Sequence, residues 1–250
     1  MKRFAIVFKT EFILFLRDFF GVFFALAFPV LMLLLFGGIY GNEPVSPEAA
    51  TGVMDVSVPA YAVMVMGVTG LMSFPLTLAG YKERKIYKRF DASPVGKKTV
   101  IAAQAVVNVV MTLFGIANLL IAGKLLYHIR IQGTLLPVCT ALLLSAAAMF
   151  SMGFFFTAVG RDEKSTNLLC YLFYFIMLFL SGATIPDMLF PAAMKTIAGF
   201  LPMTYAVDFM QGVFAGDSLI EHGKEIAVLG TLTVVLVAAG ALLYRKKDWA

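Results

Sequence analysis

Six long stretches without a charged residue constrain this 250-residue chain more than any other feature. Each is long enough to cross a bilayer, because roughly 18 to 20 apolar residues of helix span the hydrocarbon core. They cover residues 19–40, 56–81, 99–123, 131–160, 165–186 and 226–244. The alternating pattern of a membrane β-barrel strand is absent from the sequence. Since only helices and closed barrels satisfy every backbone group in lipid, we predict an all-α membrane domain of six transmembrane helices over residues 1–250.

The composition argues against the soluble classes of protein. The chain is 60% hydrophobic and 14% charged, with a mean hydropathy of +0.89. Soluble domains are about 45–50% apolar and about 25% charged. A soluble enzyme, a disordered linker and a nucleic-acid-binding domain therefore fit poorly, although the net charge is +5. The two cysteines, Cys139 and Cys170, lie in apolar stretches, which excludes a secreted disulfide framework and offers no metal-ligand spacing.

The positions of Lys and Arg predict the orientation. With both termini in the cytoplasm, 16 of the 20 basic residues lie on the cytoplasmic side, as the positive-inside rule requires. The basic charge is thereby explained without nucleic acid. The first apolar stretch has 22 residues, and its Ala25-Leu26-Ala27 lies inside it instead of after it. It is therefore expected to be a retained anchor and not a cleaved signal peptide. We predict a multi-pass protein of the cell membrane.

Residues 1–18 predict an amphipathic helix that lies in the plane of the membrane. They are too charged to span it, yet apolar residues recur near helical spacing at Phe4, Val7, Phe8, Phe12 and Phe15. Glu11 lies on this apolar stripe, which makes the pattern imperfect. The alternative is a basic flank that only sets orientation.

The loop at residues 82–98 contains seven basic residues and a short helix pattern that ends at Ser93-Pro94. Attraction to anionic headgroups explains its charge. It does not explain Ile86, Tyr87 and Phe90, which place an apolar patch on a cytoplasmic helix. Such a patch is expected to pack on the bundle itself or on a soluble partner.

Residues 187–225 are predicted to form an outer segment with a re-entrant helical hairpin before the last span. Its two apolar runs contain only 7 and 12 residues, too few to cross the membrane. Pro186, Pro191 and Pro202 break the helix at intervals.

The third span carries a row of polar residues on one helical face, at Gln104, Asn108 and Thr112. The row either joins neighbouring helices by hydrogen bonds or faces a substrate path. No ionisable Asp, Glu, Lys, Arg or His lies in the six stretches, whereas ion-coupled carriers usually hold one near the midplane.

Sequence motifs for catalysis are missing. The chain contains no phosphate-binding loop, no H-E-x-x-H and no G-x-S-x-G. His128 and His222 lie in outer loops and receive no role. We therefore predict that the chain is not an enzyme, with no catalytic residue, no metal site and no cofactor of its own.

Two segments together resemble the ABC-2 family of permeases, the membrane subunits of ATP-binding-cassette exporters. The family's inner-loop and outer-segment patterns appear here as Glu83-Arg84, Lys88-Arg89-Phe90 and Ala92-Ser93-Pro94-Val95, then Ser181-Gly182-Ala183-Thr184-Ile185-Pro186 and Pro202-Met203-Thr204-Tyr205-Ala206. The six-span plan agrees, so the resemblance covers the whole chain. One departure is the missing glycine after Glu83-Arg84, where Lys85, Ile86 and Tyr87 stand.

The resemblance implies a pair of permeases, identical or related, each with a separate ATPase subunit that binds ATP and Mg²⁺. Residues 82–90 would form the helix that couples to this ATPase, with Glu83, Arg84, Ile86, Tyr87 and Phe90 as its coupling residues. Pro186, Pro202 and Tyr205 would belong to the outer hairpin. The expected substrate is an amphiphile, such as a drug, a lipid or a lipid-linked glycan.

A self-sufficient membrane protein is the alternative function: a secondary carrier, a channel or a membrane-assembly scaffold. A carrier is expected to show inverted repeats and helices broken at the midplane. The sequence shows no clear internal duplication, and the carboxylate of a coupling-ion site is missing.

Overall fold

The computed structural model describes residues 2–44, 51–184 and 190–246 as a bundle of helices. The elements are α1 (Lys2–Arg17), α2 (Phe19–Val22), the π-helix η1 (Phe23–Ala27), α3 (Phe28–Tyr40), α4 (Val53–Gly67), the π-helix η2 (Val68–Ser73), α5 (Phe74–Glu83), α6 (Ile86–Asp91), α7 (Lys97–Tyr127), α8 (Leu135–Val159), α9 (Glu163–Leu180), α10 (Ala192–Ala198), α11 (Pro202–Ala215) and α12 (Gly223–Lys246). The only extended pairing in these residues is an isolated bridge between Pro44 and Gly52. The predicted all-α class is confirmed.

Five helices in the described part of the chain are long and apolar enough to cross a membrane. They are Phe19–Tyr40, Val53–Glu83, Lys97–Tyr127, Leu135–Val159 and Gly223–Tyr244. Each overlaps one of the predicted stretches. The remaining stretch, 165–186, corresponds to α9, which has 18 residues and is not among the five.

One continuous helix, made of α4, η2 and α5, forms the centre of the bundle. Its most apolar window is 89% buried, whereas the corresponding windows of the other four candidate spans are 11–39% buried. It packs against α3, α7, α8, α9 and α11. Glycines permit close approach on two of its sides: Gly67 lies against the ring of Tyr174, and Gly70 lies against the backbone of Met149. The other spans therefore present much of their apolar surface outward.

Each π-helix precedes a Phe-Pro pair in the middle of a span. η1 ends just before Phe28-Pro29, and η2 ends just before Phe74-Pro75. A proline has no N–H to donate and its ring crowds the preceding turn, so a helix that contains one must rearrange locally. A wider π-turn is one way to do so, and such turns are frequent at functional sites.

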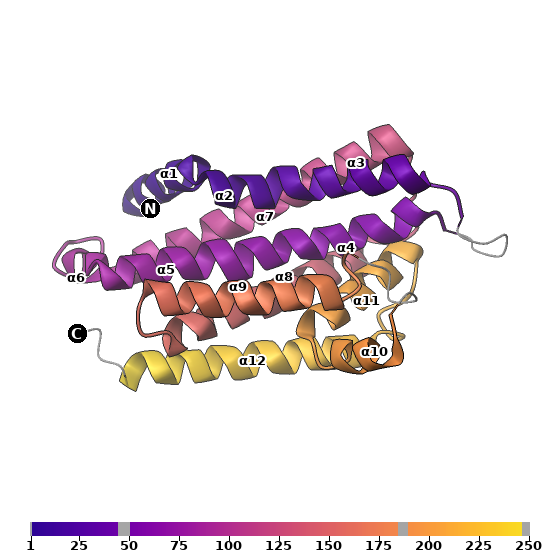
Figure 1. The fold of residues 1–250 in the computed structure, drawn as a ribbon. Coiled ribbons are helices and arrows are strands. Elements are labelled where there is room, and N and C mark those ends of the chain that lie inside the picture. Colours follow the sequence, from indigo (N-terminus) through magenta and orange to yellow (C-terminus); the bar gives the residue numbers. More distant parts are fainter. Residues whose placement is uncertain (1, 45–50, 185–189, 247–250) are drawn as a thin grey trace.

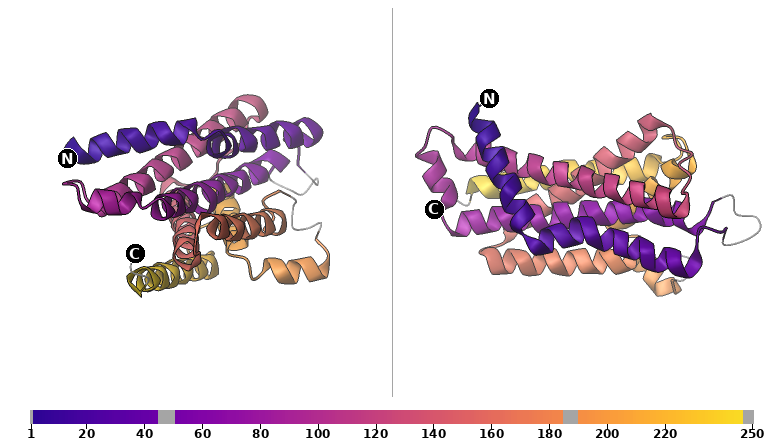
Figure 2. Two further views of the ribbon diagram at one scale, coloured as in Figure 1. Left: turned by 60° about the vertical axis from the view of Figure 1, so that its left-hand side comes forward. Right: turned by 90° about the horizontal axis from the view of Figure 1, so that it is seen from above.

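The chain places its short elements at the two ends of the bundle. Figure 1 shows α1, α6, the turn between α8 and α9 and the last turn of α12 at one end, with α10 at the other. Seen from above in Figure 2, α1 leaves the direction of α2 and α3 at a steep angle and lies over α7. Its face with Val7, Glu11 and Phe15 is buried, whereas Ile6 and Leu16 are exposed. We call the end that contains α6 the α6 end.

Candidate functional site

The short helix α6 is held at the α6 end by turns on both sides. α5 ends at Glu83, and Lys85 adopts the left-handed conformation with a φ of 54° before α6 begins. Residues other than glycine adopt this conformation only at a cost in free energy, yet Lys85 adopts it and forms a sharp turn between α5 and α6. After α6, the Ser93 hydroxyl donates to the carbonyl of Phe90. Arg3 of α1 donates to the carbonyl of Pro94 at 2.8 Å, which ties α1 to this loop.

The apolar patch of α6 packs on the bundle. Tyr87 is only 1% exposed and lies in a cluster with Val7, Phe74 and Leu78. Phe90 is partly buried against the same cluster, and Ile86 is half-buried. Of the two alternatives for this patch, packing on the bundle is therefore the one that Tyr87 shows. The ring faces inward because the bundle itself offers an apolar groove.

The exposed face of the α5–α6 segment is basic instead. The exposed residues from 83 to 91 comprise four basic ones, Arg84, Lys85, Lys88 and Arg89, and two acidic ones, Glu83 and Asp91. Tyr87 can affect a partner only through the position of α6, whereas these four basic residues are accessible to one.

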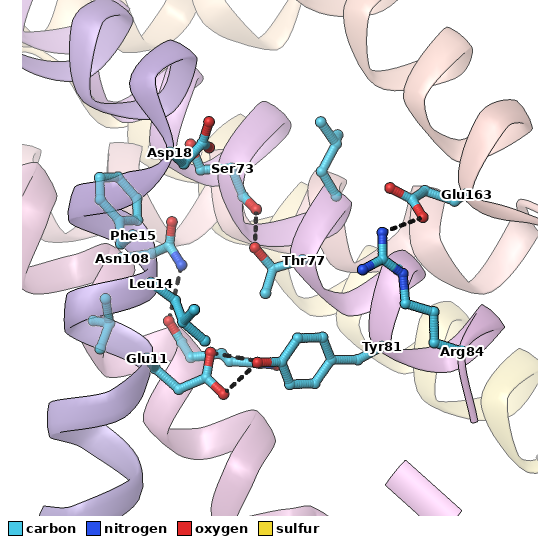
Figure 3. A pocket seen from close by; sticks show the side chains of 14 residues that line it. Glu11, Leu14, Phe15, Asp18, Ser73, Thr77, Tyr81, Arg84, Asn108 and Glu163 are labelled. Atoms are coloured by element: carbon cyan, nitrogen blue, oxygen red, sulfur yellow. Dashed lines mark hydrogen bonds and ion pairs between the residues drawn. The ribbon is translucent and has the colours of Figure 1, made fainter. Parts of the chain in front are cut away.

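A chain of hydrogen bonds connects α6 to three other helices. The Tyr87 hydroxyl donates to Oε1 of Gln104 at 2.7 Å. The Gln104 amide donates to Oε2 of Glu11 at 3.4 Å, and the Tyr81 hydroxyl donates to Oε1 of Glu11 at 2.9 Å. Figure 3 shows Glu11 and Tyr81 directed toward each other across this network. We call the four residues Glu11, Tyr81, Tyr87 and Gln104 the coupling network, because they join α1, α5, α6 and α7.

The sequence analysis selected neither Tyr81 nor Glu11 of this network, and the more buried of the two is Glu11. Its side chain is only 6% exposed. Burial raises its pKa above the ordinary value, and the hydrogen bonds from Tyr81 and Gln104 act in the opposite direction. The signal was present in the sequence, because Glu11 lies on the apolar stripe of α1.

The polar row of α7 is buried along one face. Thr112 lies 2.7 Å from Thr69 of η2, hydroxyl to hydroxyl, and the Asn108 amide donates to the carbonyl of Gln104. Gln104 and Asn108 also line a cavity, whereas Thr112 is not among the lining residues. Both alternatives for this row thus have support: Gln104 and Thr112 join neighbouring helices by hydrogen bonds, and Gln104 and Asn108 also line a cavity.

That cavity has a volume of about 320 Å³ and opens between α1, α5, α7 and the start of α9. Its apolar wall consists of Leu14, Phe15, Leu76 and Val107. Figure 3 shows its polar side, with Glu11, Asp18, Tyr81, Arg84 and Glu163 around the opening. Cavities of this size are at the lower end of the range that holds small ligands.

Glu83 and Arg84, which were predicted as coupling residues, connect α5 to the start of α9. Oε2 of Glu83 accepts a hydrogen bond from the backbone N–H of Glu163 at 2.6 Å. The Arg84 guanidinium lies 3.8 Å from the Glu163 carboxylate. Asp162 caps the start of α9: its carboxylate accepts a hydrogen bond from the Ser165 N–H, and this bond lowers the pKa of Asp162. The end of the central helix is therefore tied to the start of α9.

A comparison with family models decides what kind of protein carries this site. The model of the ABC-2 type transporter membrane domain matches residues 2–215, which is most of the chain. The chain belongs to the ABC-2 type transporter family. It is a multi-pass membrane permease, and this domain of such a transporter lacks an ATPase site. Permeases of the family pair with ATPase subunits and typically bind no cofactor.

Curated relatives of the permease are distant. It is 28% identical over 113 residues to nodulation protein J of Rhizobium leguminosarum bv. viciae, covering 45% of this chain and 44% of that protein. The corresponding protein of Rhizobium meliloti (strain 1021) is 26% identical over 114 residues, covering 46% and 44% of the two chains. The putative transport permease ycf38 of Porphyra purpurea is 24% identical over 191 residues, covering 75% of this chain and 65% of that protein. The matches thus span less than two thirds of each relative.

The far end of the permease contains the segment predicted as the outer hairpin. Pro202 is the first residue of α11, where its missing N–H is tolerated. Thr204 and Tyr205 donate from their hydroxyls to the carbonyls of Ala198 and Gly199, and thereby close the turn between α10 and α11. Pro186 lies outside the described residues.

Histidine 222 of the permease is better connected than the sequence indicated. Its ring nitrogens lie 3.3 Å from Asp217 and 3.6 Å from Glu225. His128 is exposed and ends α7 in the left-handed conformation. In residues 2–44, 51–184 and 190–246, no three His, Cys, Asp or Glu side chains gather as a metal site would require.

Proposed function

We propose that this permease forms the transmembrane path of an ABC exporter for an amphiphilic substrate: a drug, a lipid or a lipid-linked glycan. Two permease copies, identical or related, would work with separate ATPase subunits that bind ATP and Mg²⁺. The α6 end faces the cytoplasm with both termini, and α9 serves as a sixth span. The segment around α10 and α11 dips into the outer leaflet as a re-entrant hairpin.

The geometry of the ends supports this topology. The basic residues of α1, α5, α6 and the α8–α9 turn share the α6 end, as the positive-inside rule requires for a cytoplasmic face. The 18 residues of α9 rise about 27 Å at about 1.5 Å per residue, close to the thickness of the hydrocarbon core. α10 has only 7 residues, too few to cross.

The coupling network is the observation that carries the proposal. An ATPase that contacts the basic face of α6 would move a helix whose other face is bonded to α7 and α1 through Tyr87 and Gln104. Because Tyr81 belongs to the central helix, the same network reaches the centre of the bundle. Motion in the soluble subunit therefore has a direct route to the membrane helices.

Two variants separate docking from transmission. K88E and R89E together reverse two charges on the exposed face, and we expect loss of a co-purifying ATPase from host membranes. Y87F keeps the packed ring but removes the 2.7 Å hydrogen bond to Gln104. We expect it to retain the ATPase and to reduce transport per ATP several-fold, since buried hydrogen bonds contribute about 1 kcal/mol each.

The matched control is Y127F, which removes a tyrosine hydroxyl bond to Leu34 far from α6. It is expected to leave the transport per ATP unchanged. If Y87F and Y127F gave the same transport per ATP, the role of the coupling network would be contradicted. Export by the purified chain alone under an ion gradient would instead favour a self-sufficient carrier.

A further inference from the structure

The cavity beside α1 has more negative than positive groups on its wall. Glu11, Asp18 and Glu163 line it with one guanidinium, that of Arg84. Arg84 is paired with Glu163 at 3.8 Å. Within the described residues, neither Glu11 nor Asp18 has a cation within ion-pair distance. A buried carboxylate without a cationic partner is costly, so a cation from outside the chain would stabilise it.

Asn108, which lines the same cavity, carries an acceptor that is unpartnered in the described part of the chain. Asn108 is 3% exposed, and its amide nitrogen donates a hydrogen bond to the carbonyl of Gln104. Its Oδ1 atom is buried and has no hydrogen-bond partner among the described residues. A buried acceptor left without a donor costs about 1–3 kcal/mol. The site thus favours a single ligand that both donates hydrogen bonds and carries a positive charge.

The apolar lining of the cavity indicates what the rest of the ligand is. Leu14, Phe15, Leu76 and Val107 present hydrocarbon to the cavity. A volume of about 320 Å³ admits a small head group with a short segment of alkyl chain. We propose that this cavity is a binding site for a primary alkylammonium group, with the ammonium beside Glu11 and Asn108 and the methylenes along Leu14 and Val107.

Two sources can supply this chemistry: the head group of an amino-phospholipid, or a free alkylamine. Only the placement of the site on the cytoplasmic side rests on the proposed function. Binding itself requires neither the ATPase nor export, so failure of one proposal does not entail failure of the other.

The test uses the purified permease in phosphatidylcholine nanodiscs. Three probes of one chain length are titrated: hexylammonium, neutral hexanol and hexanoate. We expect hexylammonium to raise the melting temperature saturably and to give a binding isotherm by calorimetry, and the other two to do neither. E11Q is expected to weaken hexylammonium binding about tenfold, because it removes a charge-assisted hydrogen bond.

Asn108→Leu tests the site without relying on Glu11. It replaces the unpartnered amide with a side chain of similar size and should weaken binding several-fold. D91N, a carboxylate variant on the exposed surface of α6, should bind as the wild type does. Equal binding of hexanol, or unchanged affinity in both E11Q and Asn108→Leu, would overturn the proposal.

A lipid arm distinguishes the two sources. The permease is extracted from vesicles of equal phosphatidylethanolamine and phosphatidylglycerol and examined by native mass spectrometry. Retention of phosphatidylethanolamine by the wild type and its loss in Asn108→Leu identify the lipid as occupant. Hexylammonium binding without retained lipid identifies a free amine. Absence of both would refute the site.

Discussion

The contact between Gly70 of η2 and Gly153 of α8 offers the sharpest test of the packing at the centre of the bundle. A Cβ atom added at Gly153 would overlap the carbonyl oxygen of Gly70 and lie 3.2 Å from Cδ of Pro75. A Cβ atom added at Gly70 would lie 2.9 Å from the backbone of Met149 and of Phe150. These neighbours are backbone and ring atoms, so no flexible side chain can move aside.

Two opposing effects determine the size of the change in G153A. Alanine is favoured over glycine in a helix interior by up to about 1 kcal/mol. Overpacking of a well-packed interior costs about 1–3 kcal/mol, and separation of two helices lies at the upper end of that range. We therefore expect G153A to lower the free energy of unfolding by about 2 kcal/mol.

The matched control is G230A in α12, where a Cβ atom meets nothing within 4 Å. It should leave the free energy of unfolding unchanged or raise it by up to about 1 kcal/mol. Unfolding in mixed micelles, followed by circular dichroism, measures both variants under the same conditions. Stability of G153A equal to or above that of G230A would refute the close contact between η2 and α8.

Two further substitutions test buried polar groups. Since burial raises the pKa of Glu11, the stability contributed by its protonated form is complete at low pH and is lost as pH rises through the raised pKa. The melting temperature of wild type should therefore fall relative to E11Q on going from acid to neutral pH, and a pH-independent difference would contradict the burial. The Tyr174 hydroxyl is buried with no hydrogen-bond partner in the described residues, so Y174F should raise the free energy of unfolding by about 1 kcal/mol in the same assay. A destabilised Y174F would mean that the hydroxyl is bonded.

Absence of charge predicted where long helices lie, because it reflects the cost of a charge in lipid, but some helices of the structure begin at other residues than the charge-free stretches. The second span was predicted to begin at residue 56, after Asp55, whereas α4 begins at Val53. Asp55 is tolerated there because its carboxylate accepts from the N–H groups of Gly52 and Arg130. The fourth span begins later than predicted, because Gln132 and Gly133 donate instead to the carbonyl of Phe214. Such contacts join distant segments and leave no local pattern.

The candidate site shows the same division between local and distant information. Spacing placed Ile86, Tyr87 and Phe90 on one short helix, and α6 contains all three, but the predicted helix over residues 82–90 is interrupted by a turn at Arg84 and Lys85. The spacing left open which way the apolar face of this helix is turned, because a helix that packs on its own bundle and a helix that binds a partner have the same spacing. Glu11 was missed for a related reason: the two residues that donate hydrogen bonds to its carboxylate, Tyr81 and Gln104, are 70 and 93 residues away in the sequence.

The polar row of α7 connects the coupling network to η2. Gln104 and Thr112 are eight residues apart, which is about 12 Å along the helix at about 1.5 Å per residue. Gln104 belongs to the coupling network, and Thr112 is bonded to Thr69 in η2. η2 divides the central helix into α4, which packs against α3, α7, α8 and α11, and α5, which packs against α6, α7, α8 and α9.

A helix bends most readily where its regular hydrogen-bond ladder is interrupted, as at a π-turn that precedes a proline. The coupling network holds α5 through Tyr81 and α7 through Gln104, both on the α6 side of η2. A displacement of α6 would therefore bend the central helix at η2, where Gly70 and Gly153 hold it against α8. The close contact tested by G153A and the hydrogen bond tested by Y87F are thus two parts of one mechanical connection. If that connection exists, G153A should alter transport per ATP even under conditions in which the variant remains fully folded.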